Sequence, residues 1–238
     1  MAGILFIISA PSGSGKSTLV NQLRSLVDGL EFSVSYTTRR PRGSEQDGRE
    51  YHFTQRETFE RMVANGEFLE WAEVFGNYYG TAARSLSDAA AQGRDLILDI
   101  DVQGAEQVLR KLPDAVSIFI MPPNPEVLKT RLQNRSRAEH VTDESVIRRR
   151  LDQAIHEIDR VAGYSFAIVN DVLDEAVAQL RAIVLLERLR HGGHQPQGTP
   201  HDHAQWEKIA ARCRTNPPAE RLQQAINNFK SFAKPTPQ

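Results

Sequence analysis

Cysteine is almost absent from the sequence, and this shortage excludes two kinds of architecture. Cys213 is the only cysteine among the 238 residues, so neither an intrachain disulfide nor a cluster of cysteine metal ligands can form. Such a composition is typical of a reducing compartment, and we therefore expect a cytoplasmic protein.

The chain also lacks an excess of either charge. Lysine and arginine together number 29 against 30 aspartates and glutamates, which gives a formal net charge of -1. No overall field would draw such a chain to nucleic acid or to a membrane surface, so we expect neither as a stable partner. Any basic site must be local, and the composition is compatible with a homo-oligomer.

Long hydrophobic runs are missing as well. The first residues, "MAGILFIISAPSGSGKST", contain no basic segment, and their apolar run is far shorter than a membrane span. The sequence predicts a strand here rather than a signal peptide or membrane anchor. With 40% hydrophobic and 25% charged residues, the chain is typical of a globular protein with one sizeable core.

Four short apolar runs are present instead, each followed by a helical pattern. They cover residues 4–9, 96–100, 116–121 and 166–169. Solid apolar runs of this length are typical of parallel strands that are buried on both faces. The sequence therefore predicts an α/β sandwich around a parallel sheet.

Residues 32–93 differ in texture and indicate an inserted lobe that carries a ligand site. The segment is rich in Thr, Tyr, Arg and Gly and contains one convincing helical pattern. We expect this helix to begin with a capping box of Thr54 and Glu57 and to end at Asn65-Gly66. Its expected buried positions are Phe59, Met62 and Val63.

The last third of the chain predicts a mobile arm, a helix and a tail. Residues 129–150 are dense in Arg and Glu, which favours a lid. An amphipathic helix is expected at residues 172–189, followed by a segment of linker composition at 190–205. Residues 206–232 predict two short helices around Pro217-Pro218.

A phosphate-binding loop is the clearest motif. In "SAPSGSGKST" the residues Gly15, Lys16 and Ser17 stand between a predicted strand and a predicted helix, the context that makes a Walker A match credible. Backbone N–H groups would face the β-phosphate, and Lys16 would bridge the β- and γ-phosphates. The predicted ATP-binding residues of the loop are Ser12, Gly13, Ser14, Gly15, Lys16, Ser17 and Thr18.

One position departs from the usual loop pattern. Ala10 stands where the pattern begins with Gly, and alanine tolerates fewer backbone conformations than glycine. The alternative is a flexible Gly-Ser turn with a surface lysine, which the strand before and the helix after it disfavour.

With Ala10 opening it, this loop resembles the phosphate loop of guanylate kinases, and "FSVSYTTRRPRGSEQDGREYHF" resembles their GMP-binding segment. The resemblance continues through "GEFLEWAEVFGNYYGT", "LILDIDVQG" and "FAIVND", and spans residues 3–189. It implies a three-layer sandwich of the P-loop NTPase type with an inserted GMP-binding lobe and a helical lid. It also implies transfer of the γ-phosphate of ATP to GMP, and to dGMP, in purine nucleotide metabolism.

The resemblance divides the chain into a kinase domain at residues 1–189 and a tail of unknown role at 190–238. The core would comprise 1–32, 94–128 and 163–189, the GMP-binding lobe 33–93 and the lid 129–162.

Two sets of GMP ligands follow from the resemblance. Arg39, Arg42, Tyr51 and Tyr79 would bind the phosphate of GMP, and Ser35, Glu70, Thr81 and Asp101 would bind guanine or groups near it. Guanidinium forks donate strong charge-assisted bonds to a phosphate dianion. A carboxylate such as Glu70 can accept from N1–H and N2–H₂ of guanine at once, whereas adenine has no such edge. For Tyr78 we favour a packing role.

Magnesium is the expected cofactor, bound together with ATP. Ser17 would hold the ion directly through its hydroxyl, and Asp99 would support it through water. Asp99 and Asp101 alternate in "LILDID", so we expect both on one face of the strand, near its ligand-facing end.

The resemblance indicates Arg131, Arg135 and Arg150 as catalytic lid cations beside Lys16, and Asn170 as a contact to the adenine of ATP. The family usually has Gly-Arg-Gly where this chain has Asn134-Arg135-Ser136, so three further arginines compete for these roles. They are Arg137, Arg148 and Arg149. The cluster could equally be a solvated helix face paired with Glu139, Asp143 and Glu144.

Two other functions compete with the kinase. A non-catalytic guanylate-kinase-like module that binds a protein ligand is disfavoured by the intact Gly15, Lys16 and Ser17. A kinase for a phosphorylated sugar is disfavoured by the residues that would bind guanine.

Histidines give little sign of a metal site. We interpret His140 and His156 as surface residues. A metal site in the tail would use His191, His194, His201 and His203, but a connector is the better interpretation of that segment. The distal tail is locally basic and could dock on its own domain, a second subunit or an anionic partner.

Overall fold

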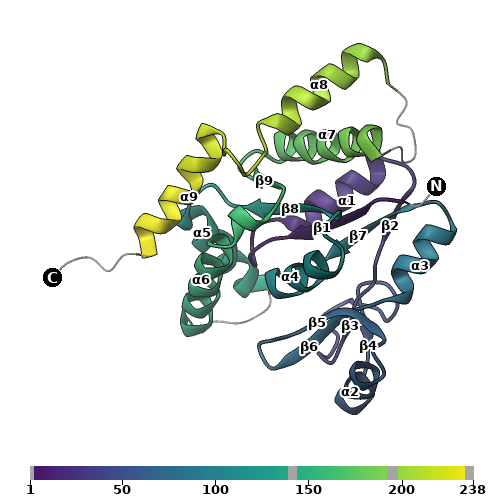
Figure 1. Ribbon diagram of the computed structural model, residues 1–238. Helices are drawn as coiled ribbons and strands as arrows, with labels where there is room; N and C mark the ends of the chain where they lie inside the picture. Colours follow the sequence, from purple (N-terminus) through teal and green to yellow (C-terminus); the bar gives the residue numbers. More distant parts are fainter. Residues whose placement is uncertain (1–2, 139–143, 192–197, 234–238) are drawn as a thin grey trace. The chain divides into compact units, whose positions relative to one another are not determined.

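The structure is a computed structural model that describes residues 3–138, 144–191 and 198–233. It contains a five-stranded sheet with the strand order β2-β7-β1-β8-β9 and a four-stranded sheet with the order β4-β3-β6-β5 (Figure 1). The strands of the first sheet are β1 (Leu5–Ser9), β2 (Leu30–Phe32), β7 (Asp95–Asp99), β8 (Val116–Met121) and β9 (Phe166–Val169).

The predicted parallel core is confirmed. Strand β2 pairs parallel to β7, and β8 pairs parallel to β9. Every residue of β1, β8 and β9 is buried, as the solid apolar runs predicted for strands covered on both faces. The sequence analysis missed only β2, which is three residues long and half-buried.

Contacts within the chain form two compact units whose boundary falls inside β1. Unit 1 is built mainly from residues up to Ile7 and from Gly29–Val116. Unit 2 is built mainly from Ile8–Asp28, Ser117–Arg190 and the C-terminal helices. The domain boundaries expected from the family resemblance stay a prediction.

Unit 1 contains the four-stranded sheet and three helices. The strands are β3 (Tyr36–Thr37), β4 (His52–Phe53), β5 (Phe68–Val74) and β6 (Asn77–Ala82). The helices are α2 (Arg56–Ala64), α3 (Arg84–Ala91) and α4 (Val102–Lys111). Helix α3 was not predicted, since the sequence analysis expected a single helix in this segment.

The start of α2 corrects one prediction. The N-cap is Gln55 and makes no side-chain capping bond, so the capping box of Thr54 and Glu57 is wrong. The reason is that the backbone N–H of Thr54 donates to the carbonyl of Thr37, which draws Thr54 toward the sheet. The end of the helix at Asn65, with Gly66 in the left-handed region, is confirmed.

Helix α2 lies against the four-stranded sheet (Figure 1). Phe59 is fully buried and stacks on Phe68, with ring centroids 4.4 Å apart, and on Tyr78, with centroids 5.3 Å apart. Met62 and Val63 are only half-buried, so a single aromatic side chain anchors the helix.

Unit 2 contains the remaining helices. They are α1 (Lys16–Leu26), α5 (Pro125–Ala138), α6 (Glu144–Ile158), α7 (Leu173–His191), α8 (Pro200–Ala211) and α9 (Glu220–Ala233), with a 3₁₀ turn at Val161–Gly163. Across the described segments, no helix combines the length and the apolar character that crossing a lipid bilayer requires.

Helix α7 is not amphipathic, contrary to expectation. The stretch 182–188 is buried without interruption and includes the charged residues Glu187 and Arg188. Glu187 forms ion pairs with Arg190 and with Arg214 of the tail, and Arg188 donates to the carbonyl of Asp28. These partners allow two charged side chains to be buried on the helix.

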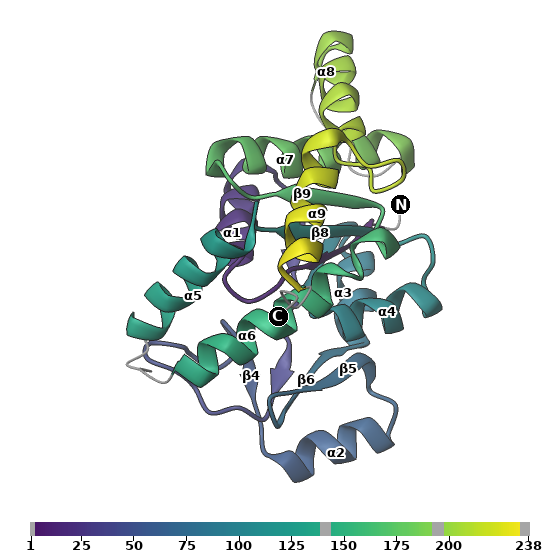
Figure 2. The same cartoon turned by 90° about the vertical axis from the view of Figure 1, so that its left-hand side faces the viewer.

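The tail is helical and docks on its own chain. Helix α8 begins inside the expected linker because Thr199 and Asp202 form a capping box around Pro200. After α8, the N–H of Ala167 on β9 donates to the carbonyl of Cys213 at 2.7 Å, and the hydroxyl of Thr215 donates to the carbonyl of Tyr164. Figure 2 shows α9 next to β9.

The reactivity of Cys213 can be used to test whether the tail is docked. Its side chain is 2% exposed, and burial raises the pKa of the thiol to about 12. We expect no reaction with a thiol reagent such as 5,5′-dithiobis(2-nitrobenzoate) in native buffer near pH 8, since the thiolate is the reactive form. The guanidinium-unfolded chain should react fully. Rapid, complete labelling of the native protein would contradict the docking of the tail.

Candidate nucleotide-binding site

The phosphate loop of unit 2 leads from β1 into α1. Gly15 is the N-cap of α1 and, like Gly13, has a left-handed backbone, with φ values of 84° and 85°. A Cβ atom at Gly15 would lie 2.5 Å from Nδ2 of Asn170 and would displace that side chain, while the positive φ itself favours glycine. Ala10 is not among the residues with positive φ, which explains why alanine is tolerated at that position.

The groups that would face a nucleotide stand at the start of α1. Lys16 is half-buried, whereas Ser17 and Thr18 are exposed in the first helical turn. No acidic residue occupies this turn, so the positive end of the helix is not neutralised locally. This arrangement can bind a polyphosphate through backbone N–H groups and the lysine cation.

Asn170 stabilises the loop. Its side-chain amide donates to the carbonyl of Ser14 at 2.7 Å, and Nη2 of Arg131 donates to the carbonyl of Asn170 at 3.0 Å. The structure therefore connects the loop to α5 through the residue that follows β9. The contact of Asn170 with adenine stays a prediction.

The arginines of the expected lid lie on two helices that pack together. Arg131 and Arg135 are one turn apart on α5, and Arg150 is half-buried on α6. Among the described residues, Nη1 of Arg131 is buried without a hydrogen-bond partner, so this cationic nitrogen retains a donor for an anion. Glu139, His140 and Asp143 lie outside the described residues.

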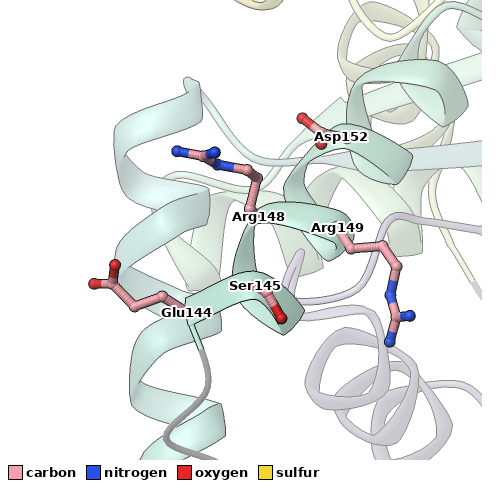
Figure 3. A pocket seen from close by; sticks show the side chains of 5 residues that line it. All are labelled: Glu144, Ser145, Arg148, Arg149 and Asp152. Carbon is pink, nitrogen blue, oxygen red and sulfur yellow. The ribbon is translucent and has the colours of Figure 1, made fainter.

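A pocket of about 410 Å³ lies on α6 (Figure 3). It is lined by Glu144, Ser145, Arg148, Arg149 and Asp152. Figure 3 shows Arg148 and Arg149 leaving the helix in different directions. They remain competitors for the roles predicted for Arg135 and Arg150.

In unit 1, three of the predicted phosphate ligands lie together. The guanidinium carbon of Arg39 lies 5.3 Å from the ring centroid of Tyr51, and the rings of Tyr51 and Tyr79 meet edge to face at 5.8 Å. Burial, together with the charge of Asp99, raises the pKa of Tyr51 to about 12. The Tyr51 hydroxyl therefore stays protonated at neutral pH and can donate a hydrogen bond.

Glu45, which the sequence analysis missed, holds this cluster. Its carboxylate accepts from Nη1 and Nη2 of Arg39 at 2.9 and 3.0 Å and from the backbone N–H of Arg42 at 2.8 Å. These contacts keep the pKa of Glu45 low despite its partial burial, because the ionised form receives all three bonds. The sequence does contain one signal for this contact: Glu45 follows Arg42 by three residues, a spacing at which a carboxylate can accept from a backbone N–H in a turn.

Three of the predicted guanine ligands also lie together and are buried. Glu70, Ser35 and Thr81 are 3%, 8% and 0% exposed. Glu70 pairs with Thr81 across strands β5 and β6, and the hydroxyls of Ser35 and Thr81 are 3.4 Å apart. Desolvation raises the pKa of Glu70 to about 7, with a further increase from the charge of Asp101, against the lowering effect of hydrogen bonds from Thr81.

Asp101 is not on the strand, as had been expected, but caps a helix. Strand β7 ends at Asp99, and Oδ1 of Asp101 accepts from the N–H of Gly104 at 2.8 Å as the N-cap of α4. The other carboxylate oxygen, Oδ2, lies 3.4 Å from the side-chain amide of Gln103. Its role toward GMP stays a prediction.

The donor atoms predicted for magnesium fit that ion in kind. Ser17 offers an exposed hydroxyl, and Asp99 offers a half-buried carboxylate. Oxygen donors suit Mg²⁺, which usually takes few protein ligands beside substrate phosphates. Within the described ranges, no three His, Cys, Asp or Glu side chains are grouped as metal ligands.

Tyr78 has the packing role expected of it. Its ring meets Trp71 edge to face at 5.7 Å, and its hydroxyl accepts from Arg56 at 2.6 Å. The surface position of His156 is confirmed, while His203 packs on Trp206 at 5.2 Å. His194 lies outside the described residues.

The sequence of this chain resembles those of known proteins over most of its length. A profile of the family "Guanylate kinase" matches residues 3–187. The chain belongs to the guanylate kinase family. A crystal structure of guanylate kinase from Anaplasma phagocytophilum has a TM-score of 0.63 and 34% identity, covering 82% of this chain and 88% of that one. The fold is thus the α/β fold of P-loop NTPase type.

Two curated guanylate kinases differ in how much of this family member they match. That of Koribacter versatilis is 52% identical over 237 residues, which is 100% of both chains. That of Neisseria meningitidis serogroup A is 50% identical over 188 residues, 79% of this chain and 90% of its own. The tail therefore has a counterpart in at least one family member.

The raised pKa of Glu70 predicts pH-dependent binding of GMP. Below a pH of about 7 the carboxyl group is protonated and one oxygen becomes a donor, so it could no longer accept from both N–H groups of guanine, the contact predicted for it. We expect the KM for GMP to rise by up to about tenfold per pH unit below that value. Glu70→Gln is the control: the GMP phosphate titrates with both proteins, but only the wild type has the carboxyl group at position 70. The same pH profile in both proteins would contradict the prediction.

The same group predicts a stability difference. The folded state raises the pKa of Glu70 from 4.5 to about 7, so it binds this proton more tightly than the unfolded state does. The wild-type free energy of unfolding therefore loses this contribution as pH rises through that window. Relative to wild type, Glu70→Gln should gain stability between about pH 4 and pH 8 in urea titrations. A constant difference would exclude the shift.

Proposed function

We propose that the chain transfers the γ-phosphate of ATP to GMP or dGMP, giving ADP and GDP or dGDP. The observation that carries this proposal is the buried Glu70, which is hydrogen-bonded by Thr81, whose hydroxyl lies 3.4 Å from that of Ser35. In its ionised form this carboxylate matches the paired N1–H and N2–H₂ donors of guanine. Adenine would leave the buried groups unpaired, a penalty that reaches ~10⁴-fold in comparable sites.

The acceptor phosphate would be held by Arg39, Arg42, Tyr51 and Tyr79. Arg39 is oriented by the two-point contact with Glu45, so its guanidinium does not need to be ordered when GMP binds. A phosphate dianion would take charge-assisted bonds from the arginines and neutral bonds from the tyrosine hydroxyls. Because dGMP has the same base and phosphate, these contacts do not separate the two nucleotides.

The donor would be held by the phosphate loop of unit 2. Lys16 and the N–H groups at the start of α1 would bind the phosphates, and Ser17 and Asp99 would contribute to Mg²⁺ binding. When bound with ATP, the ion neutralises negative charge on the phosphates. The unused donor of Arg131 supports its predicted role as a lid cation.

Transfer between two nucleotides requires no covalent protein intermediate. The contribution of this chain would be to position the two phosphates, to stabilise charge with Lys16 and the arginines of α5 and α6, and to exclude water. No buried histidine or cysteine is needed as a nucleophile or base. This agrees with the exposed position of His156 and the inert environment of Cys213.

The two alternative functions fit the structure less well. A non-catalytic binding module would not need the glycine geometry at Gly13 and Gly15, which suits phosphate binding. A sugar phosphate would leave Glu70 without matching donors. We also propose a cytoplasmic location, and a homo-oligomer is compatible with the sequence.

A coupled assay of ADP formation from ATP and Mg²⁺ tests the proposal. GMP, dGMP, AMP, CMP and UMP are offered as acceptors, and we expect activity with the two guanine nucleotides only. Lys16→Ala should lower kcat at least about a hundredfold, the range seen when one preorganised charge contact is lost. Lys208→Ala, at an exposed lysine on α8, is the matched control. Binding of GMP without phosphate transfer to any acceptor would favour the binding module instead.

A further inference from the structure

Strand β5 carries Glu70 at the edge of the four-stranded sheet. The strand order β4-β3-β6-β5 leaves one side of β5 without a neighbouring strand. Its register with β6 also shifts between Phe68 and Glu70, so Leu69 lies at an irregularity of the bulge type. Bulges bend a strand and re-aim its side chains, and they leave the backbone groups of the extra residue outside the ladder.

Helix α4 provides those partners. The side-chain amide of Gln107 acts as a strand would, because Oε1 accepts from the N–H of Trp71 at 3.3 Å and Nε2 donates to the carbonyl of Trp71 at 2.7 Å. The ammonium of Lys111 donates to the carbonyl of Leu69. The backbone is thus held on both sides of Glu70 by two side chains of one helix.

The same face of α4 leaves room for the carboxylate. Gly104 stands one turn before Gln107, and a Cβ atom there would lie 2.5 Å from Oε2 of Glu70 and 3.0 Å from its carboxyl carbon. Real Cβ atoms essentially never make a contact of 2.5 Å, and Glu70 is 3% exposed, so its carboxylate has little space to move. Residues 104, 107 and 111 share one helix face because they are three and four positions apart.

We propose that this face of α4 determines guanine specificity: Gly104 gives the carboxylate of Glu70 its place, and Gln107 with Lys111 holds the strand that aims it. The proposal rests on the proposed role of Glu70 in binding guanine. Gln107 and Gly104 are positioning residues, since neither is assigned a contact with the nucleotide. Neither residue belongs to the set carried over from the family resemblance.

Two variants test the proposal. Gln107→Met keeps the length of the side chain and removes both hydrogen bonds to Trp71. Gly104→Ala places a methyl group against the carboxylate but favours the helix, because alanine has the higher helix propensity. A purely structural role predicts that any loss of activity in Gly104→Ala follows its loss of stability and affects GMP and IMP alike. The proposal predicts a loss of GMP recognition at temperatures where the variant is fully folded.

The measurements are KM and kcat for GMP, KM for ATP, and the preference for GMP over IMP, which keeps N1–H but lacks the 2-amino group. We expect each variant to raise the KM for GMP about tenfold, the effect of misaligning one or two hydrogen bonds to a charged group. The GMP/IMP ratio of kcat/KM should fall, and KM for ATP should stay within about twofold of wild type. Arg110→Ala, at an exposed position of α4, is the matched control.

Glu70→Gln and the double variant Glu70→Gln/Gln107→Met complete the cycle. If Gln107 acts through Glu70, its substitution should have little further effect once the carboxylate is gone. If Glu70→Gln itself leaves GMP recognition intact, the proposed guanine site fails. If Glu70→Gln impairs GMP while Gln107→Met and Gly104→Ala behave like Arg110→Ala, the α4 proposal is overturned. Equal losses toward GMP, IMP and ATP would also overturn it.

Discussion

The burial of one carboxylate, that of Glu70, organises the four-stranded sheet of unit 1. Glu70 is almost fully buried, and an ionised group in such a place is unfavourable unless hydrogen bonds or charges compensate for the lost hydration. The available compensation, from Thr81 and Lys111, is partial, so the pKa of Glu70 remains near 7. Guanine would stabilise the ionised carboxylate further by donating two N–H hydrogen bonds to it. A base without these donors would leave the buried carboxylate uncompensated, and this difference would be the source of selectivity.

The surrounding fold can be understood from this constraint. Strand β5 lies at the edge of its sheet, its register with β6 shifts beside Glu70, and the side chains of α4 replace the missing strand. The arginine cluster follows a similar principle at a lower level of burial. Arg39 is held by Glu45 before any ligand arrives, so the binding geometry depends on contacts within the chain. Both cases are preorganisation by residues that need not touch a substrate.

The parts of the structure that could be predicted are those encoded by local patterns. Strands β8 and β9 have the predicted bounds because continuous apolar runs have few alternatives to burial in a sheet. The phosphate loop was recognisable because two glycines are needed at left-handed positions next to a lysine. The capping box at Thr54 failed since a sheet contact to Thr37, seventeen positions away, took priority over the local signal.

The candidate site shows the same division. Ser35, Glu70 and Thr81 were assigned through their motifs, and the structure brings them together. The sequence analysis missed Glu45, Gly104 and Gln107. Their roles depend on the atoms that lie close to them in the folded chain. Gln107 contacts the backbone of a residue 36 positions away, and no spacing rule contains that distance. The two-sided burial of α7 was missed for a similar reason, since Arg214 in the tail pairs with Glu187.

The tail can be explained by the edge that it covers. Strand β9 ends the five-stranded sheet, and an exposed edge strand presents unpaired backbone groups. The carbonyl of Cys213 satisfies the N–H of Ala167, and Thr215 satisfies the carbonyl of Tyr164. Asn170 follows β9 directly and holds Ser14 of the phosphate loop. The tail lies beyond the region that matches the family profile. It therefore stabilises a strand, β9, on which the geometry of the phosphate loop depends.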